Sequence, residues 1–390
     1  PYNKNINVCN YSNADENDIY NAIESTKSAK KIWSNYSTNE KYKIFLNAAE
    51  LVEGKYYDKI MASTIIGQGK NYYQAEIDAI SELSDFLRFN VYYHQQLQNE
   101  QPFDSDNAKN KSRWIGLNGF VASITPFNFT AIGGNLATAP ILMGNPVLWK
   151  PSPYSILSNY YFYEVLLEAG MPSEIVNFIP SDPNLFMNEI LKSKYFSGLA
   201  FTGSSEVFDN ILKKVYLNID NYVSYPRIVG ETGGNNFHFV FPDMKDNIDW
   251  VVESTIKGAY EFSGQKCSAT SRIYIPDTLF SEFMSLFESK MKKLKICSPE
   301  KDNCFTSSVI HENSYNKLKK YLIENKKDII YGGNFNDKKG FYIEPTLIRI
   351  NDLNDERWKD EHFGPILSVY VYNEKNIDEV MAVCNSITKY

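Results

Sequence analysis

The sequence contains few cysteines and histidines, and neither residue type is spaced as in a metal site. The cysteines are odd in number and scattered, and they never form a CxxC pair, which argues against a disulfide framework and a structural zinc site. They are Cys9, Cys267, Cys297, Cys304 and Cys384. The four histidines also lack ligand spacing, and the HExxH pattern fails after His311-Glu312 because Tyr315 holds its last position. We therefore expect no bound metal and a reducing compartment.

An excess of basic residues is also lacking. The chain has 40 Lys and Arg against 47 Asp and Glu, a net charge of −7. Nucleic-acid binding depends on clustered positive charge, so we expect no nucleic-acid partner. The one long uncharged stretch, residues 114–149, is interrupted by Pro126, Pro140 and Pro146. Such breaks are costly in a bilayer, so this stretch predicts a buried strand–helix–strand unit and no membrane partner.

Several nucleotide and hydrolase motifs are missing. The sequence has no GxGxxG dinucleotide fingerprint and no GxSxG elbow. The segment "GLAFTGSS" (residues 198–205) resembles a P-loop without its lysine, so triphosphate chemistry is not favoured. A strand that ends in Thr-Gly-Ser-Ser before a helix can still hold a pyrophosphate through backbone N–H groups and the helix dipole.

The order of sequence patterns predicts an α/β fold. The first hundred residues indicate amphipathic helices, one of which opens with a capping box of Ser37 and Glu40. A β-hairpin is predicted around Asn118-Gly119. Strand and helix patterns then alternate, as they do around a parallel sheet. We place a domain boundary near Val229, which gives residues 1–229 (helices, hairpin and cofactor-binding domain) and residues 230–390 (a second α/β domain).

One cysteine has an unusual context. Cys267 lies in "EFSGQKCSATSRIYIP" (residues 261–276), among small residues and before a predicted strand. Most unpaired cysteines are small buried apolar residues, and this interpretation stays open for Cys267. The small neighbours leave room for a substrate, however, and no other residue here is a better nucleophile than a thiolate.

Five segments, in order, resemble the landmarks of the aldehyde dehydrogenase superfamily. Two of them place Glu231 and Cys267 36 residues apart (267 − 231), which is close to the family's usual spacing. The wording of "QAEIDA", "PFNFTAIGGN", "NFHFV" and "FGPILSVYVY" resembles its Δ1-pyrroline-5-carboxylate dehydrogenase branch. The resemblance covers essentially the whole chain. The five segments are "TPFNFTAIGGNLATAPILMGNPVLWKPS" (125–152), "FTGSSE" (201–206), "ETGGNNFHFV" (231–240), "SGQKCS" (263–268) and "EHFGPILSVYVY" (361–372).

The resemblance implies a catalytic set. Cys267 matches the family's nucleophile, and Asn128 matches the side chain that completes the oxyanion hole with the Cys267 backbone N–H. Glu231 matches the general base for deacylation. Without its two companions, Glu231 would be interpreted as a strand-end carboxylate in a salt bridge.

The resemblance also implies NAD as the cofactor and assigns residues to it and to the aldehyde. Thr125 is assigned to the nicotinamide side of the cofactor, and Lys150 is assigned to the adenine ribose. Glu361 and Phe363 are assigned to the nicotinamide ribose and ring. The pyrophosphate turn is assigned to Gly203, Ser204, Ser205, Glu206 and Val207. The aldehyde pocket is assigned to Glu76, Phe129 and Ser268.

The chain departs from the family in two ways. Many members carry an acidic residue three places after the lysine that binds both ribose hydroxyls, where this chain has Pro153, so this feature does not support a preference for NAD over NADP. We also expect the family's C-terminal part to be missing, with the domain 230–390 truncated and the final predicted helix continuing beyond Tyr390. That part includes the loop that anchors the substrate carboxylate and an oligomerisation strand.

The implied function is NAD-dependent oxidation of L-glutamate γ-semialdehyde, which is in equilibrium with 1-pyrroline-5-carboxylate, to L-glutamate in proline catabolism. The resemblance implies a mitochondrial matrix enzyme that forms a homodimer or larger homo-oligomer when full length. Alternatives are a dehydrogenase of another aldehyde and an acyl-phosphate or acyl-CoA reductase of the same fold. A non-catalytic descendant is also conceivable, but it would be expected to lose Cys267 or Asn128, and both are present.

Overall fold

A computed structural model describes residues 1–386, which divide into two units. The N-terminal unit consists of Val8–Gly67 and Tyr73–Thr232. The C-terminal unit consists of Pro1–Asn7, Gln68–Tyr72 and the chain from Gly233 on. Two short segments from the first part of the chain thus belong to the C-terminal unit.

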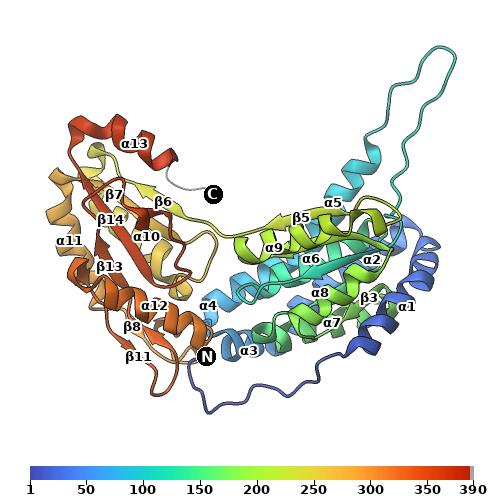
Figure 1. Ribbon diagram of the computed structural model, residues 1–390, viewed down its shortest axis with the longest axis horizontal. Coiled ribbons are helices and arrows are strands. Elements are labelled where there is room, and N and C mark those ends of the chain that lie inside the picture. Colours follow the sequence, from blue (N-terminus) through green and yellow to red (C-terminus); the bar gives the residue numbers. More distant parts are fainter. Residues whose placement is uncertain (387–390) are drawn as a thin grey trace. The chain divides into compact units, whose positions relative to one another are not determined.

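The alternating patterns of the N-terminal unit form a five-stranded parallel sheet, coloured cyan to yellow-green in Figure 1. The strand order is β3-β2-β1-β4-β5, so the chain moves outward from β1 in both directions. Strand β1 pairs on both sides, with Ser123 opposite Trp149 and Ala200. The strands are β1 (Phe120–Ile124), β2 (Val147–Lys150), β3 (Val176–Phe178), β4 (Phe196–Thr202) and β5 (Arg227–Glu231).

Helices pack on both faces of this sheet because its inner strands β1, β2 and β4 are buried on both sides. Val121 and Trp149 pack with α2, α5, α6 and α7, whereas Ala122 and Leu148 pack with α1, α8 and α9. The sequence-based prediction of a doubly covered parallel sheet is confirmed. The helices of this unit are α1 (Glu16–Ser34), α2 (Thr38–Glu53), α3 (Tyr57–Gln68), α4 (Tyr72–Ala75), α5 (Glu82–Asn99), α6 (Thr130–Leu142), α7 (Ile156–Glu168), α8 (Pro183–Lys192) and α9 (Ser205–Leu217).

The uncharged stretch of residues 114–149 is buried in this unit. It forms β1, α6 and β2, as predicted.

The capping box predicted at the start of α2 is also present. The Ser37 hydroxyl accepts from the Glu40 N–H, and the Glu40 carboxylate accepts from the Ser37 N–H at 2.7 Å. Among residues 1–386, no helix combines the length and the apolar character that a bilayer span needs.

The hairpin predicted around Asn118-Gly119 is wrong. No strand is formed by the described residues 100–119, and β1 pairs only with the parallel strands β2 and β4. Gly119 serves a different purpose. Its φ is +151°, and a Cβ there would lie 1.9 Å from the Tyr195 carbonyl oxygen, so this glycine lets the chain approach the start of β4 closely. The Phe120 N–H then donates to that same carbonyl at 3.0 Å.

The C-terminal unit is a second α/β layer structure. Its main sheet has the order β10-β13-β14-β7-β6, parallel except for the antiparallel pair β10 and β13. Helices α10 and α11 pack on one face, while α12 and α13 pack on the other. The elements are β6 (Asn236–Phe239), α10 (Ile248–Tyr260), β7 (Thr270–Pro276), α11 (Asp277–Met291), β8 (Lys295–Ile296), β9 (Cys304–Thr306), α12 (Glu312–Glu324), β10 (Ile329–Tyr331), β11 (Phe335–Asn336), β12 (Tyr342–Ile343), β13 (Thr346–Arg349), β14 (Ile366–Tyr372) and α13 (Ile377–Ser386). The predicted continuation of the last helix through 387–390 lies outside the described residues.

Candidate active site

The carboxyl ends of the N-terminal sheet gather most of the residues assigned to the cofactor. Thr125 follows β1, Lys150 ends β2, Gly203 follows β4 and Glu231 ends β5. The strand order reverses between β1 and β4, and ligands of open α/β sheets bind at such a switch point. Thr125 is buried there. Its N–H donates to the Lys150 carbonyl at 3.2 Å, and its hydroxyl accepts from the Trp149 indole at 3.2 Å.

Lys150 is a buried cation at this edge. Its side chain is only 5% exposed, and burial lowers the pKa of its ammonium group. Asp182, which caps the N-terminus of α8, opposes that shift through its charge. Asp182 has no signal in the sequence, since it lies 32 residues beyond Lys150 (182 − 150) and no spacing rule links them. Pro153 opens a 3-10 turn after Ser152, so position 153 supplies no carboxylate.

The predicted pyrophosphate turn has the structure that its sequence suggests. Ser204 caps α9, where its hydroxyl accepts from the Val207 N–H at 3.4 Å. The Gly203 N–H donates to the Glu231 carbonyl at 3.2 Å, which joins the turn to the end of β5. The exposed first turn of α9, which contains Ser205 and Glu206, directs its N–H groups outward. A diphosphate is the ligand that such a helix start favours.

Asn128 and Phe129 lie between β1 and α6. Asn128 is 4% exposed, and Phe129 is the residue that precedes the first turn of α6. Glu76, assigned to the aldehyde pocket, begins a π-helical segment, Glu76–Ser81, within the long helical region that the sequence predicted. The Tyr57 hydroxyl donates to its carboxylate. π-Helical turns are frequent at functional sites, and they leave no clear sequence signal.

Cys267 lies in the C-terminal unit, half-buried and without a disulfide. The loop that carries it is tied to the segment after Glu231. The Asn236 amide donates to the Cys267 carbonyl at 2.6 Å and to the Ala269 carbonyl at 3.2 Å. A Cβ on Gly234 would lie 2.1 Å from the Cys267 carbonyl oxygen, so glycine is required for this approach. Ser268, the residue after Cys267, is exposed.

Glu361 joins the same group of segments. Its carboxylate accepts from the Gly234 N–H at 2.9 Å, and Lys317 donates to its backbone carbonyl at 3.1 Å. Burial raises the pKa of Glu361, and the Gly234 bond and the Lys317 charge oppose that shift. Phe363, two residues on, has a left-handed backbone with φ of +51°. Cys267 and Glu361 are therefore linked in the C-terminal unit through the Gly234 backbone and the Asn236 side chain.

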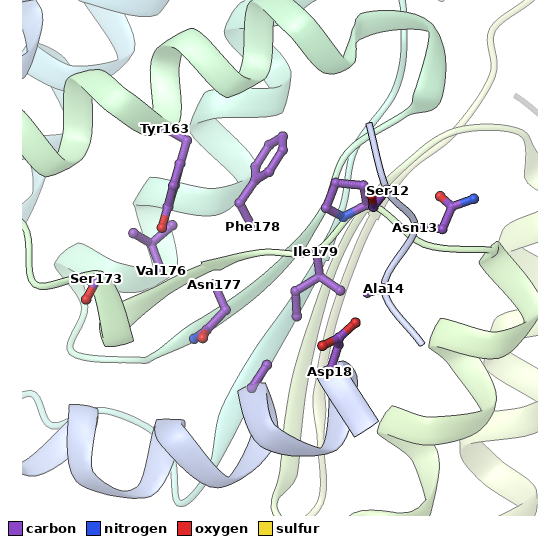
Figure 2. A pocket seen from close by; sticks show the side chains of 12 residues that line it. Ser12, Asn13, Ala14, Asp18, Tyr163, Ser173, Val176, Asn177, Phe178 and Ile179 are labelled. Carbon is purple, nitrogen blue, oxygen red and sulfur yellow. The ribbon is translucent and has the colours of Figure 1, made fainter. Parts of the chain in front are cut away.

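One pocket of the N-terminal unit contains none of the assigned residues. It measures about 380 Å³ and lies beside the edge strand β3. Figure 2 shows Asp18 of α1, Tyr163 of α7 and Asn177 of β3 around it. Among residues 1–386, no three His, Cys, Asp or Glu side chains are grouped so as to hold a metal ion.

Comparisons with known proteins identify the family. Residues 1–389 match the model of the aldehyde dehydrogenase family. The chain belongs to the aldehyde dehydrogenase family. It is 40% identical to the mitochondrial Δ1-pyrroline-5-carboxylate dehydrogenases of Danio rerio and Homo sapiens, and it covers 71% and 70% of them while all of this chain is matched.

A solved structure gives the same result for the fold. The Δ1-pyrroline-5-carboxylate dehydrogenase of Mycobacterium tuberculosis bound with NAD is similar at a TM-score of 0.92 and 35% identity, over 97% of this chain and 70% of that one. The predicted aldehyde dehydrogenase fold is therefore confirmed. This aldehyde dehydrogenase chain spans about 70% of the length of these relatives.

His362, between the two residues assigned to the nicotinamide side, predicts a pH-dependent stability. Its ring lies 4.2 Å from that of Tyr321, and burial lowers its pKa from 6.5 to about 3. Below pH 6.5 the His362 imidazole is therefore protonated in the unfolded chain, whereas in the folded chain it stays neutral down to about pH 3. Stability should fall with decreasing pH in that window, by about 1.4 kcal/mol per pH unit. Chemical denaturation of wild type and His362→Leu should show a shallower pH slope for the variant, and equal slopes would contradict the buried neutral imidazole.

Proposed function

We propose that this aldehyde dehydrogenase oxidises L-glutamate γ-semialdehyde, formed from 1-pyrroline-5-carboxylate, to L-glutamate with NAD. The observation that carries the proposal is the match of the whole chain, at 40% identity, to dehydrogenases of that name. The position of Thr125 and Lys150 at the carboxyl ends of β1 and β2 supports it, since ligands of open α/β sheets bind at this edge.

The N-terminal unit offers the groups that NAD needs. The start of α9 favours the diphosphate, Lys150 lies at the end of β2 for the adenine ribose, and Thr125 lies at the switch point. In the C-terminal unit, the Glu361 carboxylate and the Phe363 ring are assigned to the nicotinamide ribose and ring. The Gly234 N–H donates to one oxygen of the Glu361 carboxylate. A carboxylate accepts several hydrogen bonds, so a ribose hydroxyl can donate to it as well. NAD, when bound, supplies the hydride acceptor.

The chemistry of the chain itself starts at Cys267. Its thiolate attacks the aldehyde carbon, and the carbonyl oxygen becomes an oxyanion. Asn128 and the Cys267 N–H donate to that oxygen, and each donor of this kind lowers the barrier by about 3 kcal/mol. Loss of hydride from the carbon then leaves a thioester on Cys267.

Hydrolysis of the thioester requires a base, and Glu231 is assigned that task. It takes a proton from water, which attacks the thioester and releases the carboxylate product and the Cys267 thiolate. An acyl-phosphate or acyl-CoA reductase has no need of such a base. Glu231 therefore favours the dehydrogenase over this alternative.

The remaining assignments belong to the same proposal. Glu76, Phe129 and Ser268 contact the aldehyde, and the protein forms a homodimer or a larger homo-oligomer. Relatives named as mitochondrial support a location in the mitochondrial matrix. Light scattering of the purified protein and a tagged copy in cells test these two statements.

The test of the function is steady-state kinetics. The purified protein is supplied with 1-pyrroline-5-carboxylate or with short aliphatic aldehydes, first with NAD and then with NADP, and reduced cofactor is followed by absorbance. We expect the highest kcat/KM with 1-pyrroline-5-carboxylate and NAD. A clear preference for another aldehyde would overturn the substrate assignment, and activity only with an acyl phosphate or acyl-CoA and NADH would favour the reductase.

Lys150 gives a sharper test of the cofactor site. Lys150→Ala should raise the KM for NAD by more than it lowers kcat, because a ribose contact is present in the ground state and the transition state alike. Lys55→Ala is the matched control, since its ammonium pairs with Glu168 on the surface. A fall in kcat at constant KM for NAD would assign Lys150 to the chemical step instead.

A further inference from the structure

The chain approaches Cys267 through three consecutive left-handed residues. Phe262, Ser263 and Gly264 have φ values of +51°, +54° and +64°. Glycine adopts this conformation readily, whereas Phe262 and Ser263 occupy it only because their surroundings hold them there. Strain of this kind is concentrated at active sites, where it is part of the mechanism.

Ser263 is fixed to the end of β9 through both its backbone and its side chain. Its N–H donates to the Thr306 hydroxyl oxygen at 2.7 Å. Its own hydroxyl lies 3.0 Å from that oxygen and donates to the Ser307 carbonyl at 2.7 Å. Ser263 and Thr306 are each 1% exposed, so water does not compete for these bonds. We call this group, the Ser263 and Thr306 side chains with the Ser307 carbonyl, the hydroxyl clamp.

The residues on either side of Ser263 are also held. The Lys70 ammonium lies 4.6 Å from the centre of the Phe262 ring. The Gln265 amide donates to the Phe262 carbonyl at 3.2 Å and accepts from the Ile310 N–H at 2.8 Å. Lys70 and Gln265 are both fully buried, so the turn is enclosed in the C-terminal unit.

The turn also touches the segment assigned to the nicotinamide. A Cβ on Gly264 would lie 2.4 Å from the Gly364 carbonyl oxygen, so the two backbones are in close contact. Gly364 directly follows Phe363, itself a left-handed residue. The close contact with Gly364 limits movement on that side of the turn, so a relaxed turn would displace the chain that leads to Cys267.

We infer that Ser263 is a positioning residue for the nucleophile: the hydroxyl clamp holds the left-handed turn that sets the direction of the Cys267 thiol and backbone N–H. This inference rests on the proposed function, because it concerns the same cysteine. Both the thiol and the N–H act on the aldehyde, so a turn that relaxes misplaces two groups at once. A nucleophile displaced in this way slows the chemical step without weakening the cofactor contacts of the other unit.

The test compares three substitutions by steady-state kinetics. Ser263→Ala removes two of the clamp's bonds but keeps the steric cost of the turn, and Thr306→Val removes the partner at nearly constant volume. Each should lower kcat by about 10- to 100-fold with the KM for NAD changed less than about twofold. Ser263→Gly removes the hydroxyl as well, but glycine adopts the turn without help. It should therefore keep roughly tenfold more activity than Ser263→Ala.

A double-mutant cycle supplies a second measurement. If the clamp acts as one unit, the loss in kcat of Ser263→Ala combined with Thr306→Val should be smaller than the product of the two single losses, because residues in direct contact are not additive. Ser308→Ala is the matched control. Its hydroxyl is buried next to the clamp in sequence and has no hydrogen-bond partner among the described residues. It should retain wild-type kinetics.

Two results would overturn the inference. Equal activity of the alanine and glycine variants would show that the left-handed turn is not what the hydroxyl maintains. Additive losses, or a rise in the KM for NAD equal to the fall in kcat, would indicate a general disturbance of the fold. Circular dichroism shows whether each variant folds, and Ser263→Gly remains informative if the others do not. An inactive wild type with 1-pyrroline-5-carboxylate and NAD would instead count against the proposed function.

Discussion

Replacing Cys267 by alanine should abolish aldehyde oxidation and leave NAD binding almost unchanged. The thiol forms the bond to the aldehyde carbon, so without it neither the thiohemiacetal nor the thioester can form. The cofactor contacts assigned to Thr125 and Lys150 belong to the other unit and do not involve sulfur. Turnover should fall to the detection limit of the absorbance assay, while titration with NAD, followed by quenching of tryptophan fluorescence, gives a Kd within about twofold of wild type.

Cys297 provides the control for this prediction. It is half-buried in the same unit as Cys267 and likewise without a disulfide. Cys297→Ala should keep the wild-type kcat, which shows that removal of a thiol as such is harmless. Activity in Cys267→Ala comparable to wild type would end the nucleophile assignment, and with it the proposed mechanism.

Much of the fold could be predicted because local patterns and tertiary packing agree. Residues 114–149 carry no charge but several breakers, and this combination suits only a buried strand–helix–strand unit. The hairpin at Asn118-Gly119 failed for the opposite reason. Asn-Gly favours a two-residue turn locally, but at Gly119 the decisive contact is with Tyr195, which lies 76 residues away (195 − 119). A sequence window cannot reveal such a contact.

The candidate site shows the same division. Cys267 and Glu231 lie in motifs and could be proposed from the sequence, whereas the residues that hold or tune the site residues through tertiary contacts could not. Asp182 and Thr306 act through charge or a tertiary hydrogen bond, and nothing in their local sequence distinguishes them from ordinary polar residues. The left-handed backbone at Phe262 and Ser263 is equally hidden, since neither residue type favours it.

Glu231→Gln should separate the two halves of the reaction. Formation of the thioester requires the Cys267 thiolate, the Asn128 amide and the cofactor, all of which the substitution leaves in place. Hydrolysis requires a base, and glutamine cannot accept a proton from water. Rapid mixing with NAD and substrate should therefore give a burst of NADH close to one equivalent per site. A steady rate about 10²- to 10⁴-fold below wild type should follow, the usual contribution of a positioned base.

The burst also leaves a covalent trace that identifies the blocked step. Intact mass spectrometry of the Glu231→Gln protein after the burst should show one acyl adduct, and the adduct should be lost when Cys267→Ala is combined with it. Glu50→Gln is the matched control, because Glu50 is an exposed carboxylate on α2 of the same unit and has no assigned part in the reaction. A variant with neither burst nor adduct would place Glu231 earlier, in generating the thiolate. Wild-type turnover would make Glu231 a structural carboxylate and would return the acyl-phosphate or acyl-CoA reductase to consideration, since that reaction releases its product without water.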